Sequence, residues 1–296
     1  MYRKIAFIVI WYFVAAFTPS FAATDLPYTI EVAAILKVLK DSTVTSKDQD
    51  QKFTISDPKF ASLVELIQPG DRINAVLDSN NPLLIKDLKI SKPCKGSTRS
   101  LALFVSFLII IGFFTLVTKG SPKKFVIGAD NRYSNSKIQV VLWFSVLMTV
   151  YLATLGLRVL MLGWDYFGGI GIAENLLALS GISTLTYGAA KAVTVQKVEN
   201  APKLDREGPK SGGQPNILSD LFQNDNKEFD LGDTQMFFFI LLAVATFLML
   251  SFHFLGWLEY AKQISLPDVD TTLLSSLGLS QGAYLAKKAA SKPGQG

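Results

Sequence analysis

The chain has very few of the residues from which metal sites and catalytic centres are usually built. Its 296 residues include one cysteine, Cys94, and one histidine, His253. These counts exclude a disulfide within the chain and a zinc site made of several Cys and His ligands. The sequence also has no phosphate-binding glycine loop, no nucleophile elbow and no pair of carboxylates inside an apolar helix. We therefore expect no enzymatic activity, no catalytic residue, no metal and no cofactor.

Two short patterns imitate known sites, and their context argues against both. Tyr187 and Lys191, with Ser183 upstream, match the Tyr-x-x-x-Lys pattern of short-chain dehydrogenases, but no GxGxxG loop follows a strand. Residues 224–235 resemble a calcium loop, but Phe229 and Gln235 stand where that loop requires Gly and Glu.

Charged residues are also scarce, at 18% of the chain, whereas 49% of the residues are hydrophobic and occur in long runs. This composition is typical of a membrane protein. The net charge is +5, and the basic residues lie beside the apolar runs. Basic residues in that position indicate membrane topology and not nucleic-acid binding.

Residues 1–22 have the features of a secretory signal peptide. Arg3 and Lys4 precede an apolar run at residues 5–17, and Ser20 and Ala22 form a small-x-small cleavage signal. The apolar run is short for a membrane span, which favours cleavage over anchoring.

Residues 23–98 alternate in polarity over short runs separated by turn signals such as 69–71 and 78–82. We expect a small periplasmic all-β domain there, which either binds a protein partner or serves as a cap. Cys94 follows in a juxtamembrane loop. In an oxidising compartment it either pairs with the same residue of a second copy, forming a homo-oligomer, or stays an unpaired thiol.

Five apolar segments predict an all-α membrane region, at residues 101–118, 138–162, 172–195, 236–257 and 271–290. The loops after the first and third segments carry five Lys or Arg residues each, whereas the loop after the second carries none. This pattern predicts a periplasmic N-terminal domain, a cytoplasmic loop at 196–233 and a cytoplasmic C-terminus in a bacterial inner membrane. The third and fifth segments are polar enough to re-enter the bilayer or lie at its interface instead.

Several side chains near the ends of the second and fourth segments suggest particular roles. Trp143 at one end of the second segment and Trp164 at the other are placed to form interfacial aromatic belts. Arg158 is expected either to reach the headgroups or to face the interior, and His253 is a second ionisable candidate near the same surface. Paired, these two would indicate a path for anions or protons.

The last segment repeats an earlier one at a constant offset. LLALSGISTLTYGAAKAV at 176–193 aligns with LLSSLGLSQGAYLAKKAA at 273–290. Upstream, at an offset one residue shorter, Gln139 aligns with Gln235, and Ser134 aligns with Asp230, both predicted helix N-caps. The sequence therefore predicts a duplicated unit, 99–195 with the first span and 234–296 with the basic tail.

Both copies carry a Ser-Tyr-Lys stripe with helical spacing. The stripe residues are Ser183, Tyr187 and Lys191 in the first copy and Ser280, Tyr284 and Lys288 in the second. Beside the second stripe, Gly278 and Gly282 form a small-x-x-x-small pattern that lets membrane helices approach closely. Either these helices pack together, with Ser and Tyr bonding across them, or the stripes line a path for a solute.

The polar entry NRYSNSKIQ at 131–139 and the LLxLxGxS helix after it resemble segments of uncharacterised bacterial multi-span inner-membrane proteins. The resemblance covers about residues 125–292. The second copy departs from it, with DLGD at 230–233 in place of the polar entry. This family implies a helical architecture and no particular activity.

Two functions follow from these expectations. The first is a non-enzymatic envelope protein in the lipid bilayer, in which the membrane helices form a scaffold and the β-domain binds a partner. The alternative is a channel or transporter for a small solute or ion, lined by the repeated helices.

Overall fold

The computed structural model describes residues 30–31, 43–45, 52–55, 63, 66–68, 71–77, 84–128, 133–200, 215–223 and 229–290. The predicted signal peptide at 1–22, much of the loop at 196–233 and the tail beyond residue 290 lie outside these residues. Contacts between Cα atoms divide the chain into two compact units. One comprises residues 1–95 with Gly256–Ala261, and the other comprises Gly96–Leu255 with residues 262–296.

The described part of the protein is mostly helical, and four of its helices are long and apolar enough to cross a membrane. They are α4 (Gly96–Val117), α5 (Asn135–Leu162), the first 20 residues of α6 (Glu174–Asn200) and α8 (Leu231–Phe254). The predicted fifth segment forms helix α9 (Thr271–Ala290), which is not one of these four. Shorter helical segments are η3 (Pro122–Phe125), η4 (Trp164–Tyr166) and α7 (Ile217–Phe222).

The first unit contains one sheet, whose strand order is β1-β4-β5-β3-β2. Its strands are β1 (Ile30–Glu31), β2 (Thr43–Thr45), β3 (Lys52–Ile55), β4 (Arg72–Leu77) and β5 (Leu84–Pro93). The longest pairing is antiparallel, between β4 and β5, and it places Ile73 opposite Ile90. Both of these side chains are buried.

A sixth strand, β7 (Trp257–Glu259), comes from the far end of the chain and was not predicted from the sequence. It pairs antiparallel with the end of β5. The backbone N–H of Cys94 donates to the carbonyl of Gly256 at 2.9 Å, and the guanidinium of Arg72 lies 4.0 Å from the centre of the Trp257 ring. Cys94 itself is buried. The sheet therefore incorporates a segment of the connection between α8 and α9.

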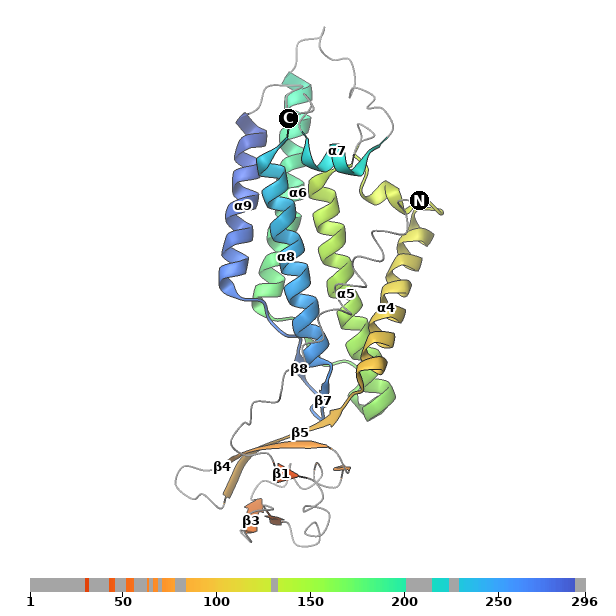
Figure 1. Cartoon of the computed structure of the whole chain (residues 1–296), viewed down its shortest axis with the longest axis vertical. Helices are drawn as coiled ribbons and strands as arrows, with labels where there is room; N and C mark the ends of the chain where they lie inside the picture. Colours follow the sequence, from red (N-terminus) through yellow and green to blue (C-terminus); the bar gives the residue numbers. More distant parts are fainter. Residues whose placement is uncertain are drawn as a thin grey trace. The chain divides into compact units, whose positions relative to one another are not determined.

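In the second unit, α5, α6, α9 and α8 form a closed ring in that order, because each helix packs against the next and α8 packs against α5. Figure 1 shows these helices side by side, with α4 lying against α5. The short connections α5–α6 and α8–α9 meet at one end of the ring. As a result α5 runs parallel to α8, and α6 runs parallel to α9.

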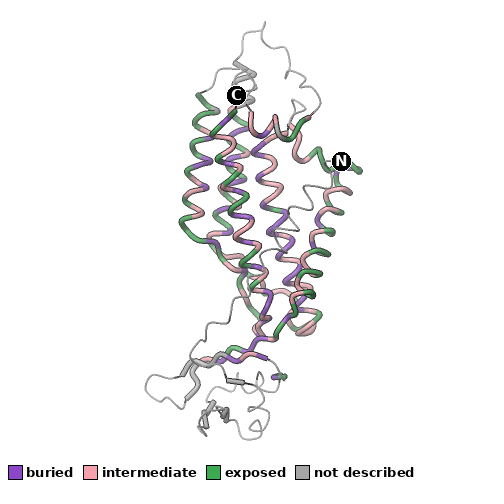
Figure 2. Tube along the Cα trace, viewed as in Figure 1, coloured by how far each residue is buried: buried purple, intermediate pink, exposed green. Residues whose placement is uncertain are grey.

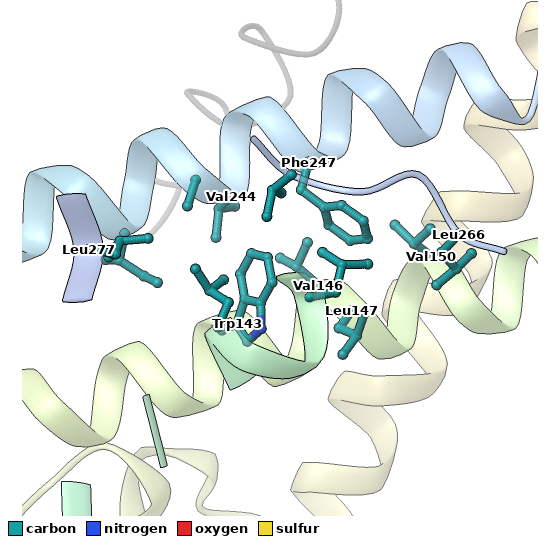
Figure 3. Packing of buried hydrophobic residues seen from close by; sticks show 13 residues of the cluster. Trp143, Val146, Leu147, Val150, Val244, Phe247, Leu266 and Leu277 are labelled. Atoms are coloured by element: carbon teal, nitrogen blue, oxygen red, sulfur yellow. The ribbon is translucent and has the colours of Figure 1, made fainter. Parts of the chain in front are cut away.

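The middle of the ring is filled by an apolar cluster (Figure 3). Its central pair is Trp143 and Phe247, whose ring centroids are 5.6 Å apart. The Trp143 indole N–H donates to the hydroxyl of Ser180 at 2.8 Å, so its polar atom is satisfied inside the protein. The prediction that Trp143 belongs to an interfacial belt is therefore wrong, since only 2% of this residue is exposed.

Helix α4 has a very different environment from the helices of the ring. Only Ser106 and Ile110 of its residues are buried, and large apolar side chains such as Leu101, Phe113 and Leu116 are exposed. Figure 2 shows exposed residues along the length of this helix. A helix that is apolar all round is typical of a membrane span. The exposed face of α4 is therefore consistent with contact with lipid.

The entries to α5 and α8 have the same local construction. The backbone N–H of Ser134 donates to Val126, and that of Asp230 donates to Phe222, each at 2.8 Å. An isolated antiparallel bridge closes each loop. Asp230 is the predicted N-cap, and its carboxylate accepts the backbone N–H groups of residues 232 and 233. Ser134 occupies the N-cap position of α5, but its side chain makes no capping hydrogen bond.

At the opposite end of the ring, the two helix connections are joined by strands β6 (Ile170–Gly171) and β8 (Ile264–Ser265), which pair in parallel. Gly169 is essential to this junction for two reasons. Its φ is +64°, and a Cβ atom placed there would lie 1.9 Å from the carbonyl oxygen of Lys262. Its neighbour Gly168 has a similar φ of +84° but open space around it.

We predict that Gly169→Ala destabilises the protein more than Gly168→Ala. The control, Gly168→Ala, carries only the cost of a left-handed backbone, about 1–2 kcal/mol. Gly169→Ala adds a backbone clash and should cost roughly a further 1–3 kcal/mol. Thermal unfolding of the two variants in detergent measures the difference, and equal losses would contradict the proposed close approach.

Candidate functional site

The candidate site is a group of buried polar side chains in the centre of the ring, close to the end where α5 and α8 begin. The Thr186 hydroxyl of α6 donates to the Gln281 Oε1 atom of α9 at 2.5 Å. The Gln281 Nε2 atom in turn lies 3.5 Å from the Oε1 atom of Gln139 on α5, where it donates a long hydrogen bond. Because α5 and α9 lie diagonally across the ring, this contact crosses its centre. All three residues are buried.

The local sequences place further polar residues on the same inward faces. On α5, Asn135 and Ser136 precede Gln139 by one helical turn, and both are buried. The Asn135 amide donates to the backbone carbonyl of Asp233 at 3.2 Å. Ser136 shares a side-chain hydrogen bond with the buried hydroxyl of Tyr284 on α9. The group therefore extends from the centre of the ring toward its end.

An ion pair closes this end of the ring on the side of α8 and α9. The Lys287 ammonium on α9 donates to the carboxylate of Asp230, the N-cap of α8. Burial raises the pKa of the Asp230 carboxyl, but the Lys287 ammonium and the backbone N–H groups of residues 233 and 232 outweigh it and hold the pKa below its usual value. The carboxylate is therefore charged at neutral pH, and it both caps α8 and holds α9.

Arg158 forms the corresponding tie at the other end. It is fully buried, its Nε atom donates to the carbonyl of Tyr166 at 3.1 Å, and its Nη2 atom donates to the carbonyl of Lys262 at 3.3 Å. Tyr166 lies in the α5–α6 connection and Lys262 lies in the α8–α9 connection. One guanidinium thus binds both connections, and of the two roles predicted for Arg158, the interior one is correct.

The residues of the two Ser-Tyr-Lys stripes differ in how deeply the structure buries them. Ser183, Ser280 and Tyr284 are buried, Tyr187 is half-buried, and Lys191 is exposed. The side chain of Lys288 lies outside the described residues. Cross-helix bonding is found for Tyr284 but not for the two serines, whose hydroxyls have no hydrogen-bond partner within the described residues.

The two glycines and the histidine also have distinct positions. Gly278 faces α6, because a Cβ atom added there would lie 3.9 Å from the Cδ1 atom of Ile182. Gly282 is exposed, with open space around it, so the small-residue stripe packs against the neighbouring helix only at its start. His253 is exposed whereas Arg158 is fully buried, so the two candidates occupy different environments.

The sequence interpretation missed Thr186 and Gln281 as members of the site. A signal was present, since glutamine is uncommon inside a membrane helix and usually faces another helix when it occurs there. The interpretation followed the residues that are identical in the two aligned segments, whereas Gln281 aligns with the exposed Thr184 and Thr186 aligns with Ala283.

Within the described residues, no group of three or more His, Cys, Asp or Glu side chains could hold a metal ion. No protein-family model, curated protein or solved structure matches the chain. The resemblance to bacterial multi-span membrane proteins therefore stays a prediction.

The Asp230 carboxyl predicts a pH-dependent stability. Because its folded pKa is lowered, the unfolded chain binds more protons near the ordinary Asp pKa of about 3.9, and stability rises with pH there. The stability that the charged Asp230 carboxylate adds is present above that pH and is lost as the pH falls through the folded pKa. Asp230→Asn, which keeps a good N-cap, should cost roughly 0.5–1 kcal/mol at pH 7.

Comparison with Asp230→Ala and Lys287→Gln separates the cap from the ion pair. Asp230→Ala should cost about 1–2 kcal/mol at pH 7, since it removes both. The difference in melting temperature between the wild type and Asp230→Asn should shrink as the pH is lowered from 5 to 3. A difference that stays constant over this range would show that the charge of Asp230 contributes nothing.

Proposed function

We propose that this protein is a non-enzymatic scaffold in a bacterial inner membrane. In this proposal the chain crosses the membrane five times, and the ring of α5, α6, α9 and α8 is the rigid support. The N-terminal sheet is exported and binds a protein partner. The single observation that carries the proposal is the apolar cluster that fills the middle of the ring, which is tied at both ends.

Three features argue for a rigid support over a conducting path. The middle of the ring is occupied by the stacked side chains of Trp143 and Phe247 and the aliphatic residues around them. One end is tied by Arg158 and the β6–β8 pair, and the other by Asp230 and Lys287. A conducting protein needs a wet axis or a movement that opens one, and each of these contacts opposes both.

The five-span topology has support from length and from charge. Helix α9 has 20 residues, which corresponds to about 30 Å, the thickness of a bilayer core. It packs between α6 and α8, both of which are candidate spans. Lys119, Lys123 and Lys124 are exposed directly after α4, which favours a cytoplasmic location for that end of the helix.

An internal duplication accounts for the matching construction of the two helix pairs. Both long helices are entered through a loop closed by an isolated bridge, and in both the backbone N–H of the N-cap residue donates to a carbonyl of the preceding loop. Each is followed by a connection that contains one strand of the β6–β8 pair, and then by a second helix. Duplicated helix pairs are frequent in transporters, so the duplication alone does not decide between the two functions.

The alternative function is a conduit for a small polar solute, and one observation favours it. The hydroxyls of Ser183 and Ser280, which the two copies share, are buried without a hydrogen-bond partner among the described residues. Groups of this kind would suit a passing solute. The apolar cluster around Trp143 stands between them and the Arg158 end of the ring, which weighs against a continuous path.

Flux measurements on the purified full chain in liposomes distinguish the two functions. The scaffold proposal predicts that proton, potassium and small-solute permeability equal those of protein-free liposomes. Flux above that level, lost in Ser183→Ala and Ser280→Ala but retained in the control Ser276→Ala, would replace the scaffold with the conduit. The control residue lies on α9, and its hydroxyl is already bonded to the backbone of Thr272.

Photo-crosslinking in intact cells tests the partner-binding part of the proposal. A photoreactive residue replacing Lys89, which is exposed on β5, should give a protein adduct of defined mass. The same residue replacing Leu116, which is exposed on α4, should react with lipid only. If the Lys89 position gives no protein adduct, the sheet acts as a cap and the partner-binding part fails.

A further inference from the structure

We propose that the polar group in the centre of the ring is a water-binding site formed by α5, α6 and α9. This inference goes beyond the scaffold function and does not depend on it, because a rigid bundle and a conducting one could both hold internal water. The ligand is water held permanently inside the protein, as part of its structure.

The proposal rests on four buried polar atoms that have no hydrogen-bond partner among the described residues. They are Asn135 Oδ1, Gln139 Nε2, Ser183 Oγ and Ser280 Oγ. Each of these residues is at least nine-tenths buried. Buried polar groups in folded proteins are nearly always paired, either with the protein or with ordered water. Four such atoms on one set of helix faces therefore call for a common explanation.

Direct contacts and helical spacing place these atoms in one group. Gln281 contacts both Gln139 and Thr186, which joins α5, α6 and α9 at one level. Ser183 lies one turn before Thr186 on α6, and Ser280 is the neighbour of Gln281 on α9. Asn135 lies one turn before Gln139 on α5. The four unpaired atoms thus belong to residues within one helical turn of the central contact.

The chemistry of the four atoms selects a neutral ligand that both donates and accepts hydrogen bonds. The Gln139 Nε2 atom is a donor and would repel a metal cation, whereas the Asn135 Oδ1 atom is an acceptor and would repel an anion. The two serine hydroxyls can do either. The charges of Asp230 and Lys287 are paired with each other and leave no net charge to balance an ion.

Water meets these requirements in the smallest volume. A buried water makes about three hydrogen bonds, so about two waters would satisfy the four atoms and the remaining lone pairs. The bilayer core supplies no water from outside the ring, and the Trp143 cluster closes the side toward Arg158. Water would therefore enter from the end at which Lys287 is half-exposed.

The sign of a stability change tests the proposal. If the Ser183 and Ser280 hydroxyls bond water, Ser183→Ala and Ser280→Ala should each lower the melting temperature of the full chain in detergent by roughly 2–4 °C. If the hydroxyls are dry and unpaired, their removal should raise the melting temperature or leave it unchanged, which would overturn the proposal. The control is Ser145→Ala, since Ser145 is buried on α5 with its hydroxyl bonded to the Val141 carbonyl.

Radiolytic labelling in ¹⁸O-water provides a second measurement that a loss of packing would not imitate. Met236 and Tyr284, which are buried beside each other, should incorporate ¹⁸O because bound water lies near them. Phe247 in the apolar cluster should not be labelled. Labelling of Met236 and Tyr284 should fall in the Ser183→Ala/Ser280→Ala double variant. If Met236 and Tyr284 are labelled no more than Phe247, the site is dry and the proposal fails.

Discussion

The buried guanidinium of Arg158 is the interaction on which the arrangement of the helices most depends. It binds carbonyl groups from both helix connections, and so fixes where α6 and α9 begin. The parallel β6–β8 pair continues the same tie. Because α6 and α9 then run side by side from a common level, Thr186 and Gln281 meet about halfway along them. A buried cation that loses its partners is strongly destabilising, so this junction has little freedom to rearrange.

The two helix pairs match in sequence but differ in where the buried face of the long helix lies relative to its N-cap. On α5 the buried stripe includes Gln139 and Trp143, whereas on α8 the aligned Gln235 is exposed and the next residue, Met236, is buried. Relative to the two N-caps, the inward face of the second long helix is thus shifted by one residue, which is a rotation of about 100°. Helix α4 packs mainly against α5 and reaches α8 through Arg99, whose guanidinium donates to the Phe252 carbonyl, so the environments of the two helices differ. The polar group is consequently asymmetric, with Gln139 and Gln281 in its centre and neither aligned residue beside them.

Features that depend on local sequence could be predicted, and features that depend on this rotation could not. Long apolar runs and the Asp230 cap locate the helices to within a few residues, because each signal acts within one or two turns. The burial of Trp143 depends on Ser180 and Phe247, which belong to other helices. Strand β7 could not be found either, since its three residues become a strand only through pairing with β5. Gln281 was visible as a polar residue in an apolar helix, but its partners were not.

The polar group can fix the register of the helices, which the apolar cluster cannot do. Helices lined only with aliphatic side chains can slide or rotate against one another at little cost, because many such packings are nearly equivalent. Gln281 accepts a hydrogen bond from Thr186 and donates one to Gln139, and both bonds are satisfied in one register only. Polar contacts between membrane helices add little stability on average, so their main effect here is to select that register. Hydration of the polar group would explain why serine and tyrosine occur at matching positions of the two aligned segments, which packing alone does not explain. Ser183, Ser280 and Tyr284 lie within one helical turn of the level at which the register is fixed, and a hydrated centre would leave their buried hydroxyls without a cost of unpaired burial.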